Sequence, residues 1–166
     1  MPRTSGGAGG GGGAGGGGGL LAVVSYAPSG GDNKTVASGT LTDLDTTNLT
    51  IPFTTAESGL GSTQVLVRLT GVYQTGGSGA NYWGLHDHTS HAVVGHLYYL
   101  VNDAPAGDGW WTPSVPILVT GLTANTAYQF DWCADSGSGA MVLIKGITAI
   151  AGSPQGGPAV MEVLAA

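Results

Sequence analysis

The fold class is decided by residues 126–134, which read Thr-Ala-Tyr-Gln-Phe-Asp-Trp-Cys-Ala. Because successive side chains on a β-strand point to opposite faces, Tyr128, Phe130 and Trp132 share one face of an extended segment. Gln129 and Asp131 share the opposite face. An aromatic face opposite a polar face is typical of a strand that covers a hydrophobic core on one side only. These residues therefore predict a half-buried strand.

Similar runs of β-branched and aromatic residues continue on both sides of this strand, from Leu20 towards the C-terminus. Gly, Pro, Asn, Asp and Ser separate the runs, and this pattern predicts about nine or ten strands joined by turns. The predicted strands are Leu20–Tyr26, Thr35–Leu41, Leu49–Thr54, Thr63–Tyr73, Ala80–Leu85, His91–Val101, Ser114–Thr120, Thr126–Ala134, Ala140–Ile150 and Ala159–Leu164. No window between the turn residues shows the apolar spacing of a helix. We predict an all-β domain, a β-sandwich or jelly roll, because such folds shield their sheet edges.

The N-terminal segment has a different composition, because residues 6–19 contain only glycine and two alanines. Such a segment has no side chains that could offset the entropy of ordering its backbone, so we expect it to be disordered in isolation. We divide the chain into a glycine-rich arm, residues 1–19, and a β-sandwich domain, residues 20–166. The arm is either a passive spacer or an anchor that becomes ordered in an assembly. Candidate anchor residues include Pro2, Arg3, Gly6 and Gly19.

Charged residues are scarce, at 8% of the chain, and the net charge is −6. With only 4 lysine and arginine residues, the protein lacks a basic surface for phosphates, so we expect no nucleic-acid partner. The single cysteine excludes an internal disulfide and indicates synthesis in a reducing cytosol. We expect no secretion signal and no membrane insertion, since the longest early apolar run covers only residues 20–24.

Two predicted strand segments, residues 96–101 and 141–150, are apolar on both faces apart from His96 and Lys145. A two-layer sandwich buries one face of each strand, so a second apolar face indicates contact with another molecule. The low charge content agrees, because obligate interfaces are depleted in charge. The alternative is a semi-exposed set of apolar side chains on a surface solvated by hydroxyl groups. Candidate interface residues are Tyr98, Leu100, Met141, Leu143 and Ile147.

Titratable groups are concentrated at residues 85–91, which read Leu-His-Asp-His-Thr-Ser-His. His86 and His88 are two residues apart and point the same way in an extended segment, so a metal ion could use both. His91, Asp87 or a symmetry-related copy would complete the coordination. The alternative is a polar loop without metal that senses pH through imidazole protonation. No other cofactor is expected.

The sequence lacks the catalytic motifs of common hydrolases. No Gly-x-Ser-x-Gly segment follows a predicted strand, and Cys133 has no nucleophile context. Asp43 and Asp45 could share a face as paired carboxylates, but the turn residues around them favour solvated turns. We therefore expect a protein that is not an enzyme.

Three tryptophans lie near predicted loops: Trp83, Trp110 and Trp111. Exposed aromatic rings stack on sugars or fill pockets of a partner protein. Core or interface packing is the alternative for the same residues.

Three features carry a resemblance to a known group of proteins: the polyglycine start, residues 119–132 (Val-Thr-Gly-Leu-Thr-Ala-Asn-Thr-Ala-Tyr-Gln-Phe-Asp-Trp) and residues 157–163 (Gly-Pro-Ala-Val-Met-Glu-Val). Together they resemble the C-terminal β-domains of minor tail and other virion-surface proteins of tailed phages that infect actinobacteria. The resemblance covers Leu20 to Ala166. Residues 121–130 also resemble the strand–turn–strand of fibronectin type III domains. Unlike many such tail proteins, this sequence shows no fibre shaft, baseplate-docking domain or collagen repeat, which favours a head-decoration or head-fibre role.

The resemblance also implies a jelly roll of the tumour-necrosis-factor-like class, in which one sheet face packs around a threefold axis. The expected function is that of a non-enzymatic virion structural protein, made in the host cytoplasm, which forms a homo-trimer and docks to a major capsid protein through its arm. A minor tail protein, docked to a tail protein instead, is the alternative within this class. A carbohydrate-binding module is the alternative from another class. It would recognise a host cell-surface glycan through the three tryptophans and the histidine loop.

Overall fold

The computed structural model describes residues 19–26, 33–36, 39–55, 63–75, 80–100, 110–136, 141–144 and 158–166. Within these ranges the regular secondary structure consists of β-strands alone, and every strand pairing is antiparallel. A search of the same ranges finds no helix able to span a membrane. The all-β prediction is confirmed.

The first sheet has the strand order β1-β13-β5-β10. Its members are β1 (Leu20–Tyr26), β13 (Ala159–Ala165), β5 (Thr63–Thr70) and β10 (Ser114–Leu122). In β10, Val115, Ile117 and Val119 are buried, whereas the alternate residues Pro116 and Leu118 are exposed. One face of this sheet therefore forms half of the core, as the period of two along the strand requires.

The second sheet has the order β3-β11-β7-β8, with β4 also paired to β11. Its members are β3 (Thr42–Asp43), β4 (Thr50–Thr54), β11 (Ala127–Ser136), β7 (Asn81–Asp87) and β8 (Val93–Leu100). Phe130 and Trp132 of β11 are buried in the core, and Tyr128 packs against it. The face predicted for these three aromatic residues is confirmed.

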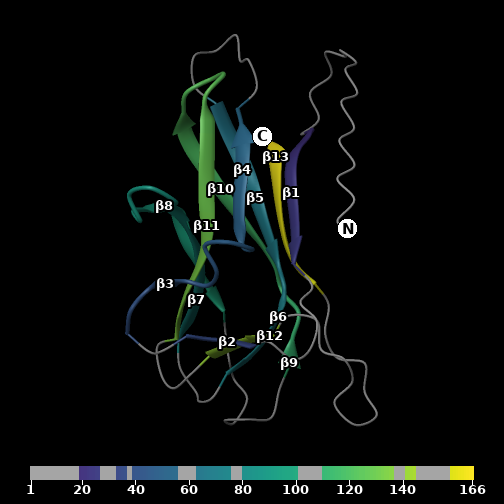
Figure 1. Cartoon of the computed structure of the whole chain (residues 1–166), viewed down its shortest axis with the longest axis vertical. Helices are drawn as coiled ribbons and strands as arrows, with labels where there is room; N and C mark the ends of the chain where they lie inside the picture. The colour runs from purple at the N-terminus through teal and green to yellow at the C-terminus, as the bar shows by residue number, and fades with distance from the viewer. Residues whose placement is uncertain are drawn as a thin grey trace.

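The two sheets face each other and exchange strands in the manner of a jelly roll (Figure 1). Along the chain, β1 lies in the first sheet, β3 and β4 in the second, β5 in the first, and β7 and β8 in the second. The chain then returns to the first sheet at β10, to the second at β11 and to the first at β13. This alternation places β1 beside β4 at one side of the sandwich and β8 beside β10 at the other. The jelly-roll prediction is confirmed, because two antiparallel sheets joined by such crossings define this architecture.

A small third sheet lies at one end of the sandwich, at the bottom of Figure 1. It has the order β2-β12-β6-β9 and consists of β2 (Asn33–Val36), β12 (Met141–Ile144), β6 (Val72–Thr75) and β9 (Trp110–Trp111). In sequence, β6 directly follows β5 of the first sheet, and β12 follows β11 of the second. The third sheet therefore joins strands that arrive from both main sheets.

Aromatic residues fill the centre of the core. Trp83 of β7 and Trp132 of β11 are fully buried, with ring centroids 4.6 Å apart in an edge-on arrangement. Tyr73 of β6 packs its ring against Trp83 at 5.5 Å. These contacts explain why the tryptophan nearest to the histidine loop faces inward. The prediction that Trp83 contacts a ligand is wrong, because a ring without exposed surface cannot stack on a sugar.

Most predicted strands agree with the structure to within two or three residues. The predicted strand Thr63–Tyr73 is wrong as a single strand, because β5 and β6 belong to different sheets. Of the predicted strand Ala140–Ile150, only residues 141–144 are described, as β12. The region after β2 also differs. The predicted strand Thr35–Leu41 is wrong: β2 is Asn33–Val36, a turn includes Gly39, and β3 starts at Thr42. Gly39 has φ +86°, a left-handed conformation that ends an extended run. The two-residue strand β9 was not predicted, since its two residues form no run.

Candidate functional site

The turn between β7 and β8 positions the predicted histidine loop. The Oδ1 atom of Asp87 accepts hydrogen bonds from the backbone amides of Ser90 (2.8 Å) and Thr89 (3.2 Å) and from the Ser90 hydroxyl (2.8 Å). The backbone amide of His91 donates to the Asp87 carbonyl at 2.9 Å. The hydrogen bonds from Ser90 hold the pKa of the Asp87 carboxyl below its usual value. Asp87 therefore organises the turn, as an aspartate commonly does at the start of one.

His91 has an unusual backbone conformation at the end of this turn. Its φ is +53°, in the left-handed region that residues other than glycine rarely adopt. The conformation turns the chain back towards β8 and brings the His91 ring beside the outer face of the second sheet. Strained backbone of this kind is often found where a side chain has a defined position to hold.

Two histidines meet a single aspartate on that outer face. The Nδ1 atom of His86 lies 2.5 Å from Oδ1 of Asp43, and Nδ1 of His91 lies 2.9 Å from Oδ2 of the same carboxylate. The His86 and Asp43 side chains are 8% and 15% exposed, and that of His91 is 60% exposed. The two rings are nearly perpendicular, at 87°. We call Asp43, His86 and His91 the Asp43 cluster.

His88 belongs to a different contact. Its Nδ1 atom lies 2.9 and 3.0 Å from the two carboxylate oxygens of Asp131, whose side chain is 1% exposed. The Thr50 hydroxyl donates to the same carboxylate. We call Asp131, His88 and Thr50 the Asp131 contact. The predicted grouping of His86, His88 and His91 is therefore corrected: Asp43 takes the place of His88.

Strand alternation explains why His86 and His88 lie on the same face, as predicted, and also why they do not share one site. His86 and His88 do lie on one face, but residues two apart on a strand are separated by about 6.5 Å, so each reaches a different carboxylate. Asp43 arrives from β3, which pairs with β11 so that Asp43 lies opposite Cys133. The prediction of a turn at Asp43 is wrong, because Asp43 lies on β3. Asp45 does cap a turn, through the backbone amides of Thr47 and Asn48, whereas Asp43 does not.

Cys133 lies on the same outer face but is covered. A Cβ atom placed on Gly84 would lie 3.3 Å from the Cys133 Sγ atom and 2.5 Å from Cδ2 of Leu97. Burial, followed by the charge of Asp43, raises the pKa of the Cys133 thiol. The thiol is therefore protonated at neutral pH and is a poor metal ligand.

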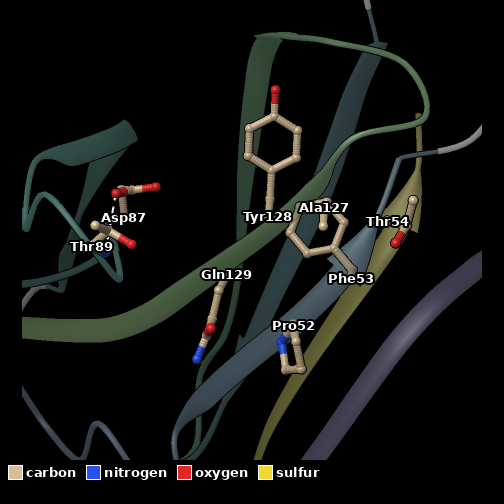
Figure 2. A pocket seen from close by; sticks show the side chains of 8 residues that line it. All are labelled: Pro52, Phe53, Thr54, Asp87, Thr89, Ala127, Tyr128 and Gln129. Atoms are coloured by element: carbon tan, nitrogen blue, oxygen red, sulfur yellow. Dashed lines mark hydrogen bonds between the residues drawn. The ribbon is translucent and has the colours of Figure 1, made fainter.

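A hollow of about 610 Å³ opens beside the Asp131 contact, between the β7–β8 turn and the strands β4 and β11. Figure 2 shows Asp87 and Thr89 at one side of it and Tyr128, Gln129 and Pro52 at the other. The lining mixes the aromatic rings of Phe53 and Tyr128 with amide, hydroxyl and carboxylate groups. Its size lies in the range of small-molecule sites, about 300–1,000 Å³.

Exposed apolar side chains lie along β8, at the edge of the second sheet opposite β3, and along the neighbouring strand β10 of the first sheet. These residues are between 37% and 48% exposed, and they are Val93, Leu97, Tyr98, Tyr99 and Leu118. The two strands are in close contact, since a Cβ atom on Gly95 would lie 3.0 Å from the Leu118 carbonyl oxygen. We call these residues the β8–β10 edge.

The predicted interface and anchor residues have different outcomes. Tyr98 belongs to the β8–β10 edge, but Leu100 is buried in the core, so its prediction as an interface residue is corrected. The carbonyl of Gly19 accepts a hydrogen bond from the Ala165 amide at 2.9 Å, which joins the end of the arm to the domain. Four other predicted positions lie outside the described residues: Pro2, Arg3, Gly6 and Ile147. Four more lie on strands whose side chains are not described: Trp110, Trp111, Met141 and Leu143.

Comparison with known proteins identifies no family for this chain. No protein-family description and no curated sequence matches it. Among solved structures, it is similar to the VP2 subviral particle of infectious bursal disease virus, with 11% sequence identity and a TM-score of 0.30. The match covers 86% of this chain and 31% of the viral chain, so this chain spans under a third of that protein.

Proposed function

We propose that this protein is a non-enzymatic structural subunit of a virus particle, a capsid decoration or head-fibre protein that associates with further copies of itself. The β8–β10 edge is the single observation that carries this proposal. Five apolar side chains on two neighbouring strands are 37% to 48% exposed, and burying them against a second copy would remove this apolar area from water. The charge-poor sequence and the jelly-roll architecture, which is common in capsid proteins, agree with it.

The two strands of this edge differ in how they resist further pairing. β10 contains Pro116, which has no backbone N–H to offer and is exposed. β8 reads Val-Val-Gly-His-Leu-Tyr-Tyr-Leu and has no proline, lysine or carboxylate, the residues with which proteins usually protect an edge strand. The occupant we propose for this edge is a second copy of the same chain, and a ring of three copies is the assembly we expect.

Docking to the particle would use the glycine-rich arm. Three weak arm contacts made at once by one trimer raise the effective concentration of each arm at its site, and this converts weak contacts into durable attachment. The expected docking partner is a major capsid protein, with a tail protein as the alternative. Deleting residues 2–19 is expected to leave a folded oligomer that no longer attaches to particles.

Light scattering and sedimentation of the full chain over a concentration series test self-association. We expect a trimer that Tyr98→Lys and Tyr99→Lys, each made singly, convert to monomer, because a lysine ammonium group is costly to bury. Thr46→Lys adds the same charge in the exposed turn between β3 and β4 and should leave the trimer intact. A monomeric wild-type chain would overturn the proposal. Immunogold labelling of particles from the biological source of the sequence then tests the virion location.

A second candidate function is binding of a host cell-surface glycan, and the hollow beside the β7–β8 turn favours it. The Tyr128 ring offers a stacking surface, and Gln129 and Thr89 offer hydrogen bonds of the type that sugars use. Binding of the wild-type chain to a glycan array, lost in Gln129→Ala, would support this function. Equal binding by both chains would place any glycan site elsewhere.

A further inference from the structure

The Asp43 cluster has the composition and position of a metal-binding site. We propose that Asp43, His86 and His91 bind one divalent transition-metal ion of the Zn²⁺ class on the outer face of the second sheet. Two imidazole nitrogens and a carboxylate are a donor set that suits zinc, whereas calcium and magnesium prefer oxygen ligands alone. The proposal does not depend on the function of the protein in a virus particle.

The donor atoms already lie close together. One ligand atom from each of the three residues can be chosen so that all lie within 4.8 Å of one another. Donors on a tetrahedral zinc ion are about 3.4 Å apart, given Zn–N and Zn–O bonds of about 2.0–2.2 Å. Both imidazoles present Nδ1 to the Asp43 carboxylate, at 2.5 and 2.9 Å. An ion could therefore enter between them with a small outward movement of the carboxylate.

Three separate parts of the fold hold these ligands. His86 lies on the central strand β7, and its side chain is almost fully buried. Asp43 lies on β3, which is hydrogen-bonded to β11. His91 is held by the Asp87-capped turn in a left-handed conformation. The backbone positions of His86 and His91 are thus set before any ion binds, and preorganisation of this kind lowers the cost of binding.

The surroundings leave room for a fourth ligand. The His91 side chain is 60% exposed, so water can reach the site. Among the described side chains, the one arginine, Arg68, pairs with Glu162 of the first sheet and does not neutralise Asp43. A site with three protein ligands and one open position is the arrangement that zinc adopts when it also binds water.

A bound ion would join parts of the chain that are distant in sequence. β3 has only two residues and pairs with β11 alone among the described strands, so its own hydrogen bonds hold it weakly. Coordination would tie β3 to β7 and to the β7–β8 turn. Because the ion would bind the folded chain and not the unfolded one, it should raise the thermal stability.

The test uses the untagged full chain, freed of metal with a chelator and titrated calorimetrically with Zn²⁺ at neutral pH. We expect one ion per chain and micromolar or tighter affinity, with a rise in Tm of about 5–10 °C at saturation. Co²⁺ should give the strong visible absorption of a four-coordinate ion. Asp43→Asn and His91→Asn should each weaken Zn²⁺ binding at least about 100-fold, and Asn at position 91 keeps the left-handed backbone accessible.

Two controls make the outcome decisive. His96→Asn changes an exposed histidine of β8, and His88→Gln changes the histidine of the Asp131 contact. Both variants should bind Zn²⁺ as the wild type does. Absence of saturable binding below millimolar Zn²⁺ would overturn the proposal. Wild-type affinity in His91→Asn, or a loss in His88→Gln equal to that in His91→Asn, would also overturn it.

Discussion

The Asp43 cluster and the Asp131 contact use the same residue types on the same sheet face, yet they are built differently. Asp131 is enclosed, at 1% side-chain exposure, and its carboxylate meets one histidine and one hydroxyl group. Asp43 is at the edge of the sheet and meets two histidines, one of them open to solvent. The Asp43 carboxylate is 15% exposed and meets the exposed His91 ring, whereas the Asp131 carboxylate is enclosed, so only Asp43 stays available to a ligand. Four predictions follow this difference, all for protein kept in chelator.

The largest effect is expected for Asp131→Ala. This change removes the acceptor of the buried Thr50 hydroxyl and of the half-buried His88 ring, which should cost about 2–4 kcal/mol in the free energy of unfolding. Asp43→Ala, the matched change at the Asp43 cluster, should cost less, about 1–2 kcal/mol, because solvent reaches the exposed His91 ring even though His86 stays buried. Urea unfolding followed by tryptophan fluorescence measures both. An equal or reversed order would contradict the assignment of the structural role to Asp131.

Thr50→Val should have a smaller effect within the Asp131 contact. Valine has nearly the same shape, so the change removes one hydrogen bond to a charged acceptor and little packing, at a cost of about 1–2 kcal/mol. A double-mutant cycle with Asp131→Ala should give a coupling energy close to the Thr50→Val effect. Thr46→Val, in an exposed turn, serves as the control and should be neutral within about 0.5 kcal/mol.

Position 91 should respond to backbone conformation more than to loss of the ring. His91→Val places a β-branched residue at φ +53° and should cost about 1 kcal/mol, whereas His91→Asn should be nearly neutral because asparagine tolerates this region. Thermal unfolding of both variants makes the comparison. Equal stability would indicate that the turn relaxes to a different backbone conformation.

The smallest effect concerns acid. The folded-state pKa of Asp87 is lowered by its hydrogen bonds with Ser90, so the unfolded chain binds more protons in the acid range. The stability that this carboxylate contributes is therefore present above about pH 4, its unfolded pKa, and is lost as pH falls through the lower folded pKa. Asp87→Asn should flatten the stability curve between pH 5 and pH 3 by less than about 1 kcal/mol, since the group is exposed. A steeper curve for the variant would contradict the sign.

The sequence predicted the histidines of the candidate site but not their aspartate partner. The density of histidines at residues 86–91 identified the right turn, and alternation placed His86 and His88 on one face. Asp43 was missed as a partner, because its neighbours favour turns and nothing in the local pattern reports a contact with a residue 43 positions later. The only signal that could have pointed to it is an acidic residue with no basic residue near it in the sequence.

The order of residues alone determined the fold class, most of the strands and the inward face of β11, because these follow from a period of two that is read within a few neighbouring residues. It also placed apolar residues on both faces of β8. Strand order, the burial of Trp83 and Leu100, and the partition of five ionisable groups into the Asp43 cluster and the Asp131 contact depended on the folded chain. The physical reason is that sheet pairing and packing join residues that are far apart in sequence, and no local period encodes which strands will meet.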